Sequence, residues 1–319
     1  MKLVILDGYT ENPGDLSWDW LGELVEEYKV YDKTETDDVL QRCEGADIVV
    51  TNKVPLPSSI IEKLPNLKFI STLSTGYNVV DCDFAREKGI PVSNIPAYST
   101  TGVTQSVFAL LFELCNQVGL HSNCVMAGEW TTSEHFCFWK TPLSEIAGKT
   151  FGIIGLGKIG THVAKVALAF GMKVLVYTPN TRHFDGEGDV SFVSMDEVLK
   201  NSDAISLHCP LTDDTDKLVN KDFIAKMKKS AYLINTSRGQ VIDETDLAAA
   251  LENGDLAGFG ADVLSTEPPM PNNPLLGAKN CFITPHIAWA SYESRIRLMN
   301  TFKGNIEGFV KNEPVNLVN

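Results

Sequence analysis

The sequence predicts an α/β protein with two domains, each built on a doubly wound parallel sheet. Short apolar runs alternate with segments of helical periodicity along most of the chain, which is the pattern of strands and helices in parallel sheets. A glycine-rich turn lies near the middle, between one such run and one such helical segment. The length of 319 residues corresponds to about two domains.

The composition is acidic. Lys and Arg number 27 and Asp and Glu number 41, so the formal net charge is 27 − 41 = −14. This charge argues against nucleic acid and anionic membranes as partners, although a small anionic substrate can still bind in a locally positive cleft. Seven cysteines stand at no metal-like spacing, and we find neither a secretory signal nor an apolar stretch long enough to cross a bilayer. We therefore expect a cytoplasmic protein with reduced thiols and no bound metal.

The first domain is expected to alternate strands and helices up to a proline-containing connector at 94–99. The apolar runs that predict strands are Lys2–Leu6, Lys29–Tyr31, Ala46–Thr51, Leu67–Leu73 and Ile90–Ser93. The segments that predict helices are Trp18–Tyr28, Asp37–Cys43, Ser58–Leu64 and Asp81–Lys88. A last helix at Ser291–Phe309 is expected to return to this domain, which would then comprise residues 1–98 and 288–319.

The second domain is expected to span residues 99–287 and to begin with a long helix. Val103, Val107 and Leu110 share one face of that helix, which is predicted to run from Thr100 to about Gly119. The predicted strands are Phe151–Ile154, Met172–Tyr177, Val190–Val193, Ala204–His208, Tyr232–Asn235, Gly258–Val263 and Cys281–Thr284. Helices are predicted after the glycine-rich turn and at Asp196–Lys200, Asp222–Met227 and Glu244–Asn253.

The segment His121–Pro142 has no clear period and is long for a loop within a compact domain. It carries Trp130, Phe136, Phe138 and Trp139, an apolar load that a loop would not leave in water. Such a segment suits a subunit contact or a pocket wall. Packing against a satellite of the core is the alternative.

The glycine-rich turn has the spacing of a dinucleotide-binding fingerprint. Gly155, Gly157 and Gly160 follow one predicted strand and open a helix. The first glycine permits a tight turn, the second lets a pyrophosphate approach the backbone, and the third lets the helix pack on the strand. The helix N-terminus offers N–H groups and a positive dipole end to phosphates. Since a second strand follows at Rossmann spacing, we predict a Rossmann domain that binds NAD(P)H rather than an ordinary glycine loop.

The choice between the two nicotinamide cofactors depends on the end of that second strand. Thr178 stands where an NAD-specific site usually has an acid that accepts the ribose hydroxyls. With no carboxylate there to repel a 2′-phosphate, and with Arg182 close by in the sequence to bind one, NADPH or dual use is slightly favoured. Asp185 or Glu187 could instead supply the acid from a less usual position.

Arg238, Glu267 and His286 follow strands of the second domain and should lie on the sheet edge that carries the glycine turn. Reduction of a 2-oxo acid needs a cation for the carboxylate, a proton donor and a hydride. Arg238 suits the first role because its planar fork binds a carboxylate through two hydrogen bonds. His286 suits the second because imidazole titrates near neutral pH, and Glu267 would orient the ring and stabilise its protonated form. Taken singly, such residues, like His208 at another strand end, are more often structural.

A second candidate binding element lies in the first domain. Ser74, Thr75 and Gly76 follow a predicted strand, and ligands of open α/β sheets bind beyond the carboxyl ends of strands. Their successive backbone N–H groups could hold an anion, as a nest does. A plain turn before the next helix is the alternative.

Five motifs, in this order, make the chain resemble the D-isomer-specific 2-hydroxyacid dehydrogenases over essentially its full length. They are Ser74–Asn78, Gly155–Gly160, Asn235–Gly239, Asp262–Pro268 and Thr284–Ala288. The resemblance implies reversible hydride transfer between NAD(P)H and a small 2-oxo acid. Within the family the match is best with members that convert hydroxypyruvate or glyoxylate into D-glycerate or glycolate. A homodimer formed through the nucleotide domain is also implied.

The resemblance also implies roles for individual residues. Arg238 would bind the substrate together with the backbone N–H groups of the 74–76 turn, and Glu267 and His286 would form the acid/base pair. The implied cofactor contacts are Thr104, Gly155, Gly157, Lys158, Ile159, Gly160, Thr178, Arg182, Cys209, Pro210, Thr215, Thr236, Ser237, Arg238, Asp262, His286 and Ala288. Thr178 and Ala288 depart from the acid and the glycine that the family often has at these positions.

Two other functions are compatible with the same motifs. The family includes transcriptional corepressors that keep the fold, so a dinucleotide-sensing interaction protein with little turnover is the main alternative. The acidic charge and the lack of basic tails weigh against it. A related oxidation of a one-carbon anion such as formate is a third interpretation, which no feature of the sequence demands.

Overall fold

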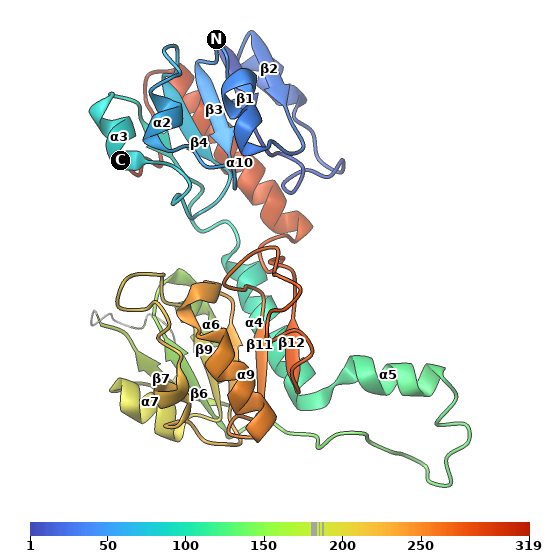
Figure 1. Ribbon diagram of the computed structural model, residues 1–319. Coiled ribbons are helices and arrows are strands. Elements are labelled where there is room, and N and C mark those ends of the chain that lie inside the picture. The colour runs from blue at the N-terminus through green and yellow to red at the C-terminus, as the bar shows by residue number, and fades with distance from the viewer. Residues whose placement is uncertain (180–183, 185, 187) are drawn as a thin grey trace. The chain divides into compact units, whose positions relative to one another are not determined.

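The computed structural model of the protein describes residues 1–179, 184, 186 and 188–319. The chain divides into two compact units: Met1–Ser99 with Trp289–Asn319 form unit 1, and Thr100–Ala288 form unit 2. Each unit contains one sheet in which every strand pairing is parallel, with helices packed on both of its faces (Figure 1). The predicted fold class, two doubly wound α/β sheets, is confirmed.

The sheet of unit 1 has five strands in the order β2-β1-β3-β4-β5. The strands are β1 (Lys2–Ile5), β2 (Glu27–Val30), β3 (Ile48–Thr51), β4 (Phe69–Thr72) and β5 (Val92–Ser93). The helices are η1 (Asp19–Glu23), η2 (Thr36–Asp38), α1 (Val39–Arg42), α2 (Ser58–Ile61), α3 (Cys82–Glu87) and α10 (Tyr292–Val310). Every residue of β3 and β4 is buried, as expected for central strands of a parallel sheet covered on both faces. Phe302 of α10 belongs to the core on one face, and Val39 of α1 to the core on the other.

The sheet of unit 2 has seven strands in the order β12-β11-β10-β9-β6-β7-β8. The strands are β6 (Thr150–Ile154), β7 (Lys173–Tyr177), β8 (Val190–Phe192), β9 (Ala204–Leu207), β10 (Tyr232–Asn235), β11 (Gly258–Ala261) and β12 (Cys281–Ile283). The helices are α4 (Thr100–Asn116), α5 (Val118–Met126), α6 (Lys158–Ala169), α7 (Met195–Asn201), α8 (Lys221–Ile224), η3 (Gly239–Val241) and α9 (Glu244–Asn253). The order reverses beside β6, so the glycine turn after β6 lies at the point where open α/β sheets bind ligands.

Four predicted helices are wrong in extent. Ser58–Leu64 ends at Ile61 and Asp222–Met227 ends at Ile224, and the other two differ for visible reasons. Trp18–Tyr28 contains only the short helix η1, and β2 already begins at Glu27. The N–H groups of Glu26 and Glu27 both donate to the Met1 carbonyl (3.1 and 3.3 Å), which draws this segment into the sheet. The long helix predicted to reach Gly119 ends at Asn116, because Gln117 has φ +43, a left-handed conformation that a helix cannot continue through.

A separate helix, α5, occupies part of the segment that was expected to be irregular. In Figure 1, α5 and the segment after it extend away from the seven-stranded sheet, and no residue of α5 is buried. Met126 (83% exposed), Phe136 (90%) and Trp139 (65%) show that this segment leaves large apolar side chains uncovered. The alternative expectation, that this segment packs against a satellite of the core, is therefore wrong for Met126, Phe136 and Trp139.

Within the described ranges, no single helix is long and apolar enough to cross a membrane. In the same part of the chain, one bent pair, α4 and α5, meets that length and composition when joined across its bend of 57°. Likewise, no group of three or more His, Cys, Asp or Glu side chains that could hold a metal ion occurs among the residues that the structure describes.

Candidate active site

The glycine turn after β6 has the backbone that a dinucleotide needs. Gly155 has φ +97, and a Cβ there would lie 2.7 Å from the carbonyl carbon of His208, so any side chain would be both strained and obstructed. A Cβ on Gly160 would collide with the Gly155 carbonyl, which explains how closely α6 packs on this turn. A Cβ on Gly157 would meet nothing within 4 Å, so the turn is open on the side where a pyrophosphate approaches.

The α6 helix continues this fit. Gly157 is its N-cap, and Lys158 and Ile159 supply its first N–H groups without any side-chain cap. The free N–H groups and the positive end of the helix dipole are directed at the open side of the turn. An anion such as a dinucleotide pyrophosphate therefore fits the residues present here.

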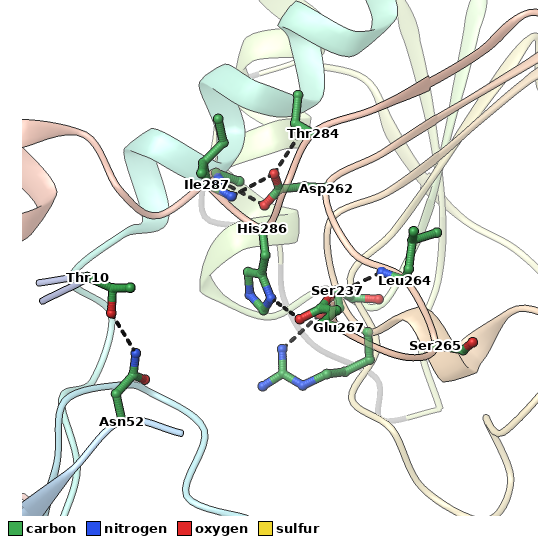
Figure 2. Close-up of polar contacts among 12 residues, drawn as sticks. Thr10, Asn52, Ser237, Asp262, Leu264, Ser265, Glu267, Thr284, His286 and Ile287 are labelled. Atoms are coloured by element: carbon green, nitrogen blue, oxygen red, sulfur yellow. Dashed lines mark hydrogen bonds and ion pairs between the residues drawn. The ribbon is translucent and has the colours of Figure 1, made fainter. Parts of the chain in front are cut away.

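His286 and Glu267 form a close pair in unit 2. The His286 Nδ1 lies 2.6 Å from Glu267 Oε2, and both side chains are partly accessible to solvent (Figure 2). The other Glu267 oxygen accepts the Leu264 N–H (3.1 Å), which fixes the carboxylate. Because Nδ1 is engaged with the acid, Nε2 is the ring atom left to exchange a proton with a ligand. An imidazole held by a carboxylate in this way has the geometry that a general acid requires.

Asp262 holds the chain on either side of His286. It is 2% exposed, and its carboxylate accepts the Thr284 hydroxyl (2.6 Å) and the N–H groups of Ile287 (2.9 Å) and Ala288 (2.8 Å), as Figure 2 shows in part. His286 itself has φ +55, a conformation uncommon for any residue but glycine. Such a backbone persists only where surrounding bonds fix it, and Asp262 supplies those bonds.

The charge state of Asp262 is also set by its surroundings. Burial raises the pKa of Asp262 above its ordinary value, against the opposing hydrogen bonds from Thr284, Ala288 and Ile287 and the charge of His286. The resemblance implied a cofactor contact for Asp262. The structure adds a set of contacts that the sequence did not predict, since the partners lie 22 to 26 residues away in the chain.

Arg238 lies at the end of β10, on a turn that packs against the segment carrying Glu267. A Cβ on Gly239 would collide with the Leu264 backbone, so this turn and the Glu267 segment are in direct contact. Asn235 stabilises the turn by donating to the Arg238 carbonyl (2.9 Å) and accepting the Ser237 N–H (3.0 Å). The Arg238 side chain is half-buried and donates through Nη1 to the Ser237 carbonyl (2.8 Å). The guanidinium thus has further N–H groups for a ligand.

His208 and Cys209, which directly follow β9, contribute only uncharged side chains. Burial lowers the pKa of His208 to about 4, so this imidazole is neutral at physiological pH, and within the described ranges no acid shifts its pKa. Burial raises the pKa of the Cys209 thiol, which therefore stays protonated. Neither side chain is suited to carry a proton in the reaction. His208 is therefore a weaker candidate than His286 for the proton donor.

Among the other residues expected to contact the cofactor, Thr215 and Thr104 have hydrogen-bond partners within the chain, whereas Thr236 has none among the described residues. Thr215 donates its hydroxyl to the Pro210 carbonyl (2.7 Å) and accepts the Thr212 N–H, which closes the loop after β9. Thr104, buried on α4, donates to the Thr100 carbonyl (2.9 Å) and lies 3.0 Å from His162 Nδ1. The Thr236 hydroxyl is buried without a hydrogen-bond partner among the described residues.

The residues that would distinguish NADH from NADPH are only partly described. Thr178 lies directly after β7 and is half-buried. Arg182, Asp185 and Glu187 lie outside the described residues.

In unit 1, the turn Ser74–Gly76 follows β4. Its side chains bond within the unit: Ser74 Oγ donates to the Gly76 carbonyl (2.6 Å) and Thr75 Oγ1 to the Ile95 carbonyl (2.8 Å). Among the described residues, no acceptor is found for the backbone N–H groups of Ser74, Thr75 and Gly76. Three successive free N–H groups at the carboxyl end of a strand suit a small anion.

The chain is similar to known proteins in sequence and in structure. Residues 108–288 match the family model described as "D-isomer specific 2-hydroxyacid dehydrogenase, NAD binding domain". The chain is 51% identical over 322 residues to a hydroxypyruvate reductase of Blautia hydrogenotrophica, with 100% of both covered. It is 41% identical to a glycerate dehydrogenase of Methylorubrum extorquens, with 92% of each covered. A D-lactate dehydrogenase of Aquifex aeolicus, solved with NAD and lactic acid, has a TM-score of 0.85 and 31% identity, with 98% of this chain and 96% of that chain covered.

The open glycine turn and the carboxylate-supported imidazole, taken with these similarities, define a nicotinamide-dependent oxidoreductase that acts on CH–OH groups. The chain belongs to the D-isomer-specific 2-hydroxyacid dehydrogenase family. The resemblance seen in its five motifs is confirmed.

Proposed function

We propose that this dehydrogenase reduces hydroxypyruvate or glyoxylate to D-glycerate or glycolate, and that it catalyses the reverse reaction. The observation that carries the proposal is the 2.6 Å contact between His286 and Glu267, which supports His286 as the proton donor. The names of the similar hydroxypyruvate reductase and glycerate dehydrogenase support the choice of substrate.

When bound, the nicotinamide dinucleotide supplies the hydride that reduces the carbonyl carbon. Arg238 binds the substrate carboxylate and polarises the carbonyl oxygen with its remaining N–H groups. His286, protonated and supported by Glu267, gives its Nε2 proton to the carbonyl oxygen as that oxygen gains negative charge. Hydride and proton together convert the 2-oxo acid into the 2-hydroxy acid, and the reverse reaction returns the proton to His286.

We assign the remaining predicted residues to binding. The N–H groups of Ser74, Thr75 and Gly76 are assigned to the substrate carboxylate, as three free donors suit a small anion. The free N–H groups of the 74–76 turn and the open side at Gly157 support these assignments. The proposed cofactor contacts are Thr104, Gly155, Gly157, Lys158, Ile159, Gly160, Thr178, Cys209, Pro210, Thr215, Thr236, Ser237, Arg238, Asp262, His286 and Ala288, with Arg182 from outside the described residues.

The experiment that tests the function follows the loss of NADPH and NADH absorbance, in parallel, with hydroxypyruvate, glyoxylate, pyruvate and phenylpyruvate. We expect fast turnover with hydroxypyruvate or glyoxylate. Folded protein that binds the dinucleotide but turns over no 2-oxo acid would contradict the proposal and favour a dinucleotide-sensing protein.

We propose that the protein uses NADPH at least as well as NADH, because Thr178 offers no carboxylate to repel a 2′-phosphate. Thr178→Asp should therefore shift the ratio of kcat/KM values toward NADH by on the order of tenfold, equivalent to about 1.4 kcal/mol. Steady-state kinetics with both cofactors measures this ratio. Ser191→Asp, which adds the same charge at an exposed position of β8, should leave it unchanged. An unchanged ratio in Thr178→Asp would mean that this position does not face the ribose.

We also propose a homodimer in which the exposed apolar segment from α5 to Leu143 contacts the second subunit. Large uncovered side chains such as Met126, Phe136 and Trp139 support this assignment, since monomers rarely expose contiguous apolar surface. Replacing Phe136 and Trp139 together by Glu should convert a dimer into a monomer, because two charges would be buried without partners. Light scattering measures the mass, with Val315→Glu in unit 1 as the control. A wild-type monomer would contradict the assignment.

We place the enzyme in a reducing compartment such as the cytoplasm. All seven cysteines are free thiols, which supports this placement.

A further inference from the structure

Unit 1 contains a buried carboxyl group that the proposed chemistry does not use. Glu11, in the turn after β1, is 0% exposed. Its Oε1 accepts the side-chain amide of Asn52 (2.6 Å) and the Thr10 hydroxyl (3.0 Å). Its Oε2 is buried and has no hydrogen-bond partner within the part of the chain that the structure describes. A carboxyl oxygen in this position is costly to charge, because neither water nor a protein donor solvates it.

Asn52, which donates a hydrogen bond to Glu11, belongs to a loop whose backbone N–H groups are all hydrogen-bonded. Asp7 accepts the three successive N–H groups of Asn52 (2.8 Å), Lys53 (2.6 Å) and Val54 (3.2 Å). Asn52 also reaches the Thr10 hydroxyl (3.4 Å), a contact drawn in Figure 2. The loop Asn52–Val54 is thus tied by its backbone to Asp7 and by its side chain to Glu11.

This loop is the neighbour of the turn proposed to bind the substrate carboxylate. Asn52–Val54 follows β3, and Ser74–Gly76 follows the adjacent strand β4. The two strands are parallel with Thr51 opposite Thr72, and the Leu73 N–H donates to the Thr51 carbonyl (2.8 Å). Both segments therefore leave the sheet of unit 1 side by side at its carboxyl edge.

The charged groups around Glu11 do not neutralise it. Asp7 is a like charge, while Lys53 is the cation of the adjoining loop. Arg295 of α10 donates to the Glu11 main-chain carbonyl (3.3 Å), but its guanidinium pairs with both oxygens of Asp15 (2.6 Å each). Burial first, and the charge of Asp7 second, raise the pKa of Glu11 to about 8. Glu11 is therefore neutral at physiological pH and becomes charged in mildly alkaline solution.

We propose that Glu11 is a positioning residue of the substrate site, which fixes the Asn52–Val54 loop beside the Ser74–Gly76 turn and lowers affinity for the 2-oxo acid when its carboxyl group ionises. The proposal rests on the proposed function, because it assigns the 74–76 turn to the substrate. Ionisation would place a negative charge one loop away from an anion site, with no protein donor found for Glu11 Oε2 among the described residues. This charge would weaken binding of an anionic substrate and leave the proton transfer by His286 untouched.

The first test is thermodynamic and needs no turnover. A buried acid whose pKa is raised stabilises the fold fully below its unfolded pKa, near 4.5, and that stabilisation is lost as pH rises to about 8. Glu11→Gln is isosteric with the neutral acid and cannot ionise. Its Tm relative to wild type should therefore increase from pH 5 to pH 8 and then level off. Glu62→Gln, at an exposed position after α2, should show no such trend. A flat difference for Glu11→Gln would overturn the proposal.

The second test is kinetic. The KM of the wild type for hydroxypyruvate should rise by on the order of threefold to tenfold as pH passes 8, whereas the KM of Glu11→Gln should not follow this rise. Glu11→Leu, which leaves the Asn52 amide without its acceptor, should raise KM by on the order of tenfold at every pH. In both variants kcat and the dissociation constant of the cofactor should match the wild type. A Glu11→Gln enzyme with the KM profile of the wild type would overturn the proposal while leaving the proposed function intact.

Failure of the proposed function and failure of the Glu11 proposal give different results in these tests. If the wild type turns over no 2-oxo acid, the proposed function fails and the assignment of Glu11 to a substrate site fails with it. The Tm comparison then still decides whether Glu11 is a buried neutral acid.

Discussion

Replacing His286 by alanine should lower kcat for hydroxypyruvate reduction by at least about a hundredfold, because general acid catalysis by a positioned side chain contributes on the order of 10² to 10⁴. In the proposed mechanism, the carboxylate 2.6 Å from Nδ1 keeps the imidazole oriented, so that Nε2 can deliver the proton. Without the ring, water must protonate the developing alkoxide. Stopped-flow measurement of a single turnover separates this step from product release.

Two controls show whether the loss is chemical. The cofactor should still bind to His286→Ala, since the glycine turn and α6 remain to hold the pyrophosphate when this ring and its cofactor contact are removed. Added imidazole should restore part of the rate, because the truncation leaves space for it. Near-normal kcat would remove His286 from proton transfer.

Replacing Arg238 by glutamine should lower kcat/KM for the 2-oxo acid by on the order of 10² to 10³. Removing one partner of a hydrogen-bonded charge pair costs about 2–5 kcal/mol, and each tenfold corresponds to about 1.4 kcal/mol. Arg238 is half-buried on a turn fixed by Asn235 and Gly239, so no other cation of that turn can replace it. Arg238→Lys should fall between the wild type and Arg238→Gln, because it keeps the charge and loses the planar fork.

The readout for Arg238 is steady-state kinetics at a saturating cofactor concentration. Arg86→Gln, which removes an exposed arginine of α3 paired with Asp83, should match the wild type. If Arg238→Gln kept the wild-type kcat/KM, the substrate carboxylate would have to be bound elsewhere.

Much of the unit 2 site follows from local patterns. The spacing of Gly155, Gly157 and Gly160 requires only adjacent residues to be read, and the structure has the tight turn and open approach that this spacing predicts. Glu267 and His286 are 19 residues apart, yet each follows a strand of one parallel sheet, and such strands end at the same edge. The sequence alone therefore predicts that these two side chains lie close together, and the structure gives the distance between His286 Nδ1 and Glu267 Oε2.

The residues that sequence did not identify act through distant partners. Asp7 and Glu11 hold a loop more than 40 residues away, and nothing local to them signals burial. Asp262 was expected at the cofactor, but its three bonds across 22 to 26 residues could not be predicted. The helix predicted at 18–28 failed for a similar reason, because pairing of Glu27 with β1 overrode the local helical pattern.

The measurement that tests the central claim most directly is chiral chromatography of the product formed from hydroxypyruvate and NADPH, repeated with NADH. A D-isomer-specific dehydrogenase with His286 as its proton donor should yield D-glycerate in stoichiometric amount with the cofactor oxidised. Formation of L-glycerate, of a racemate, or of no glycerate from protein that binds the cofactor would contradict it.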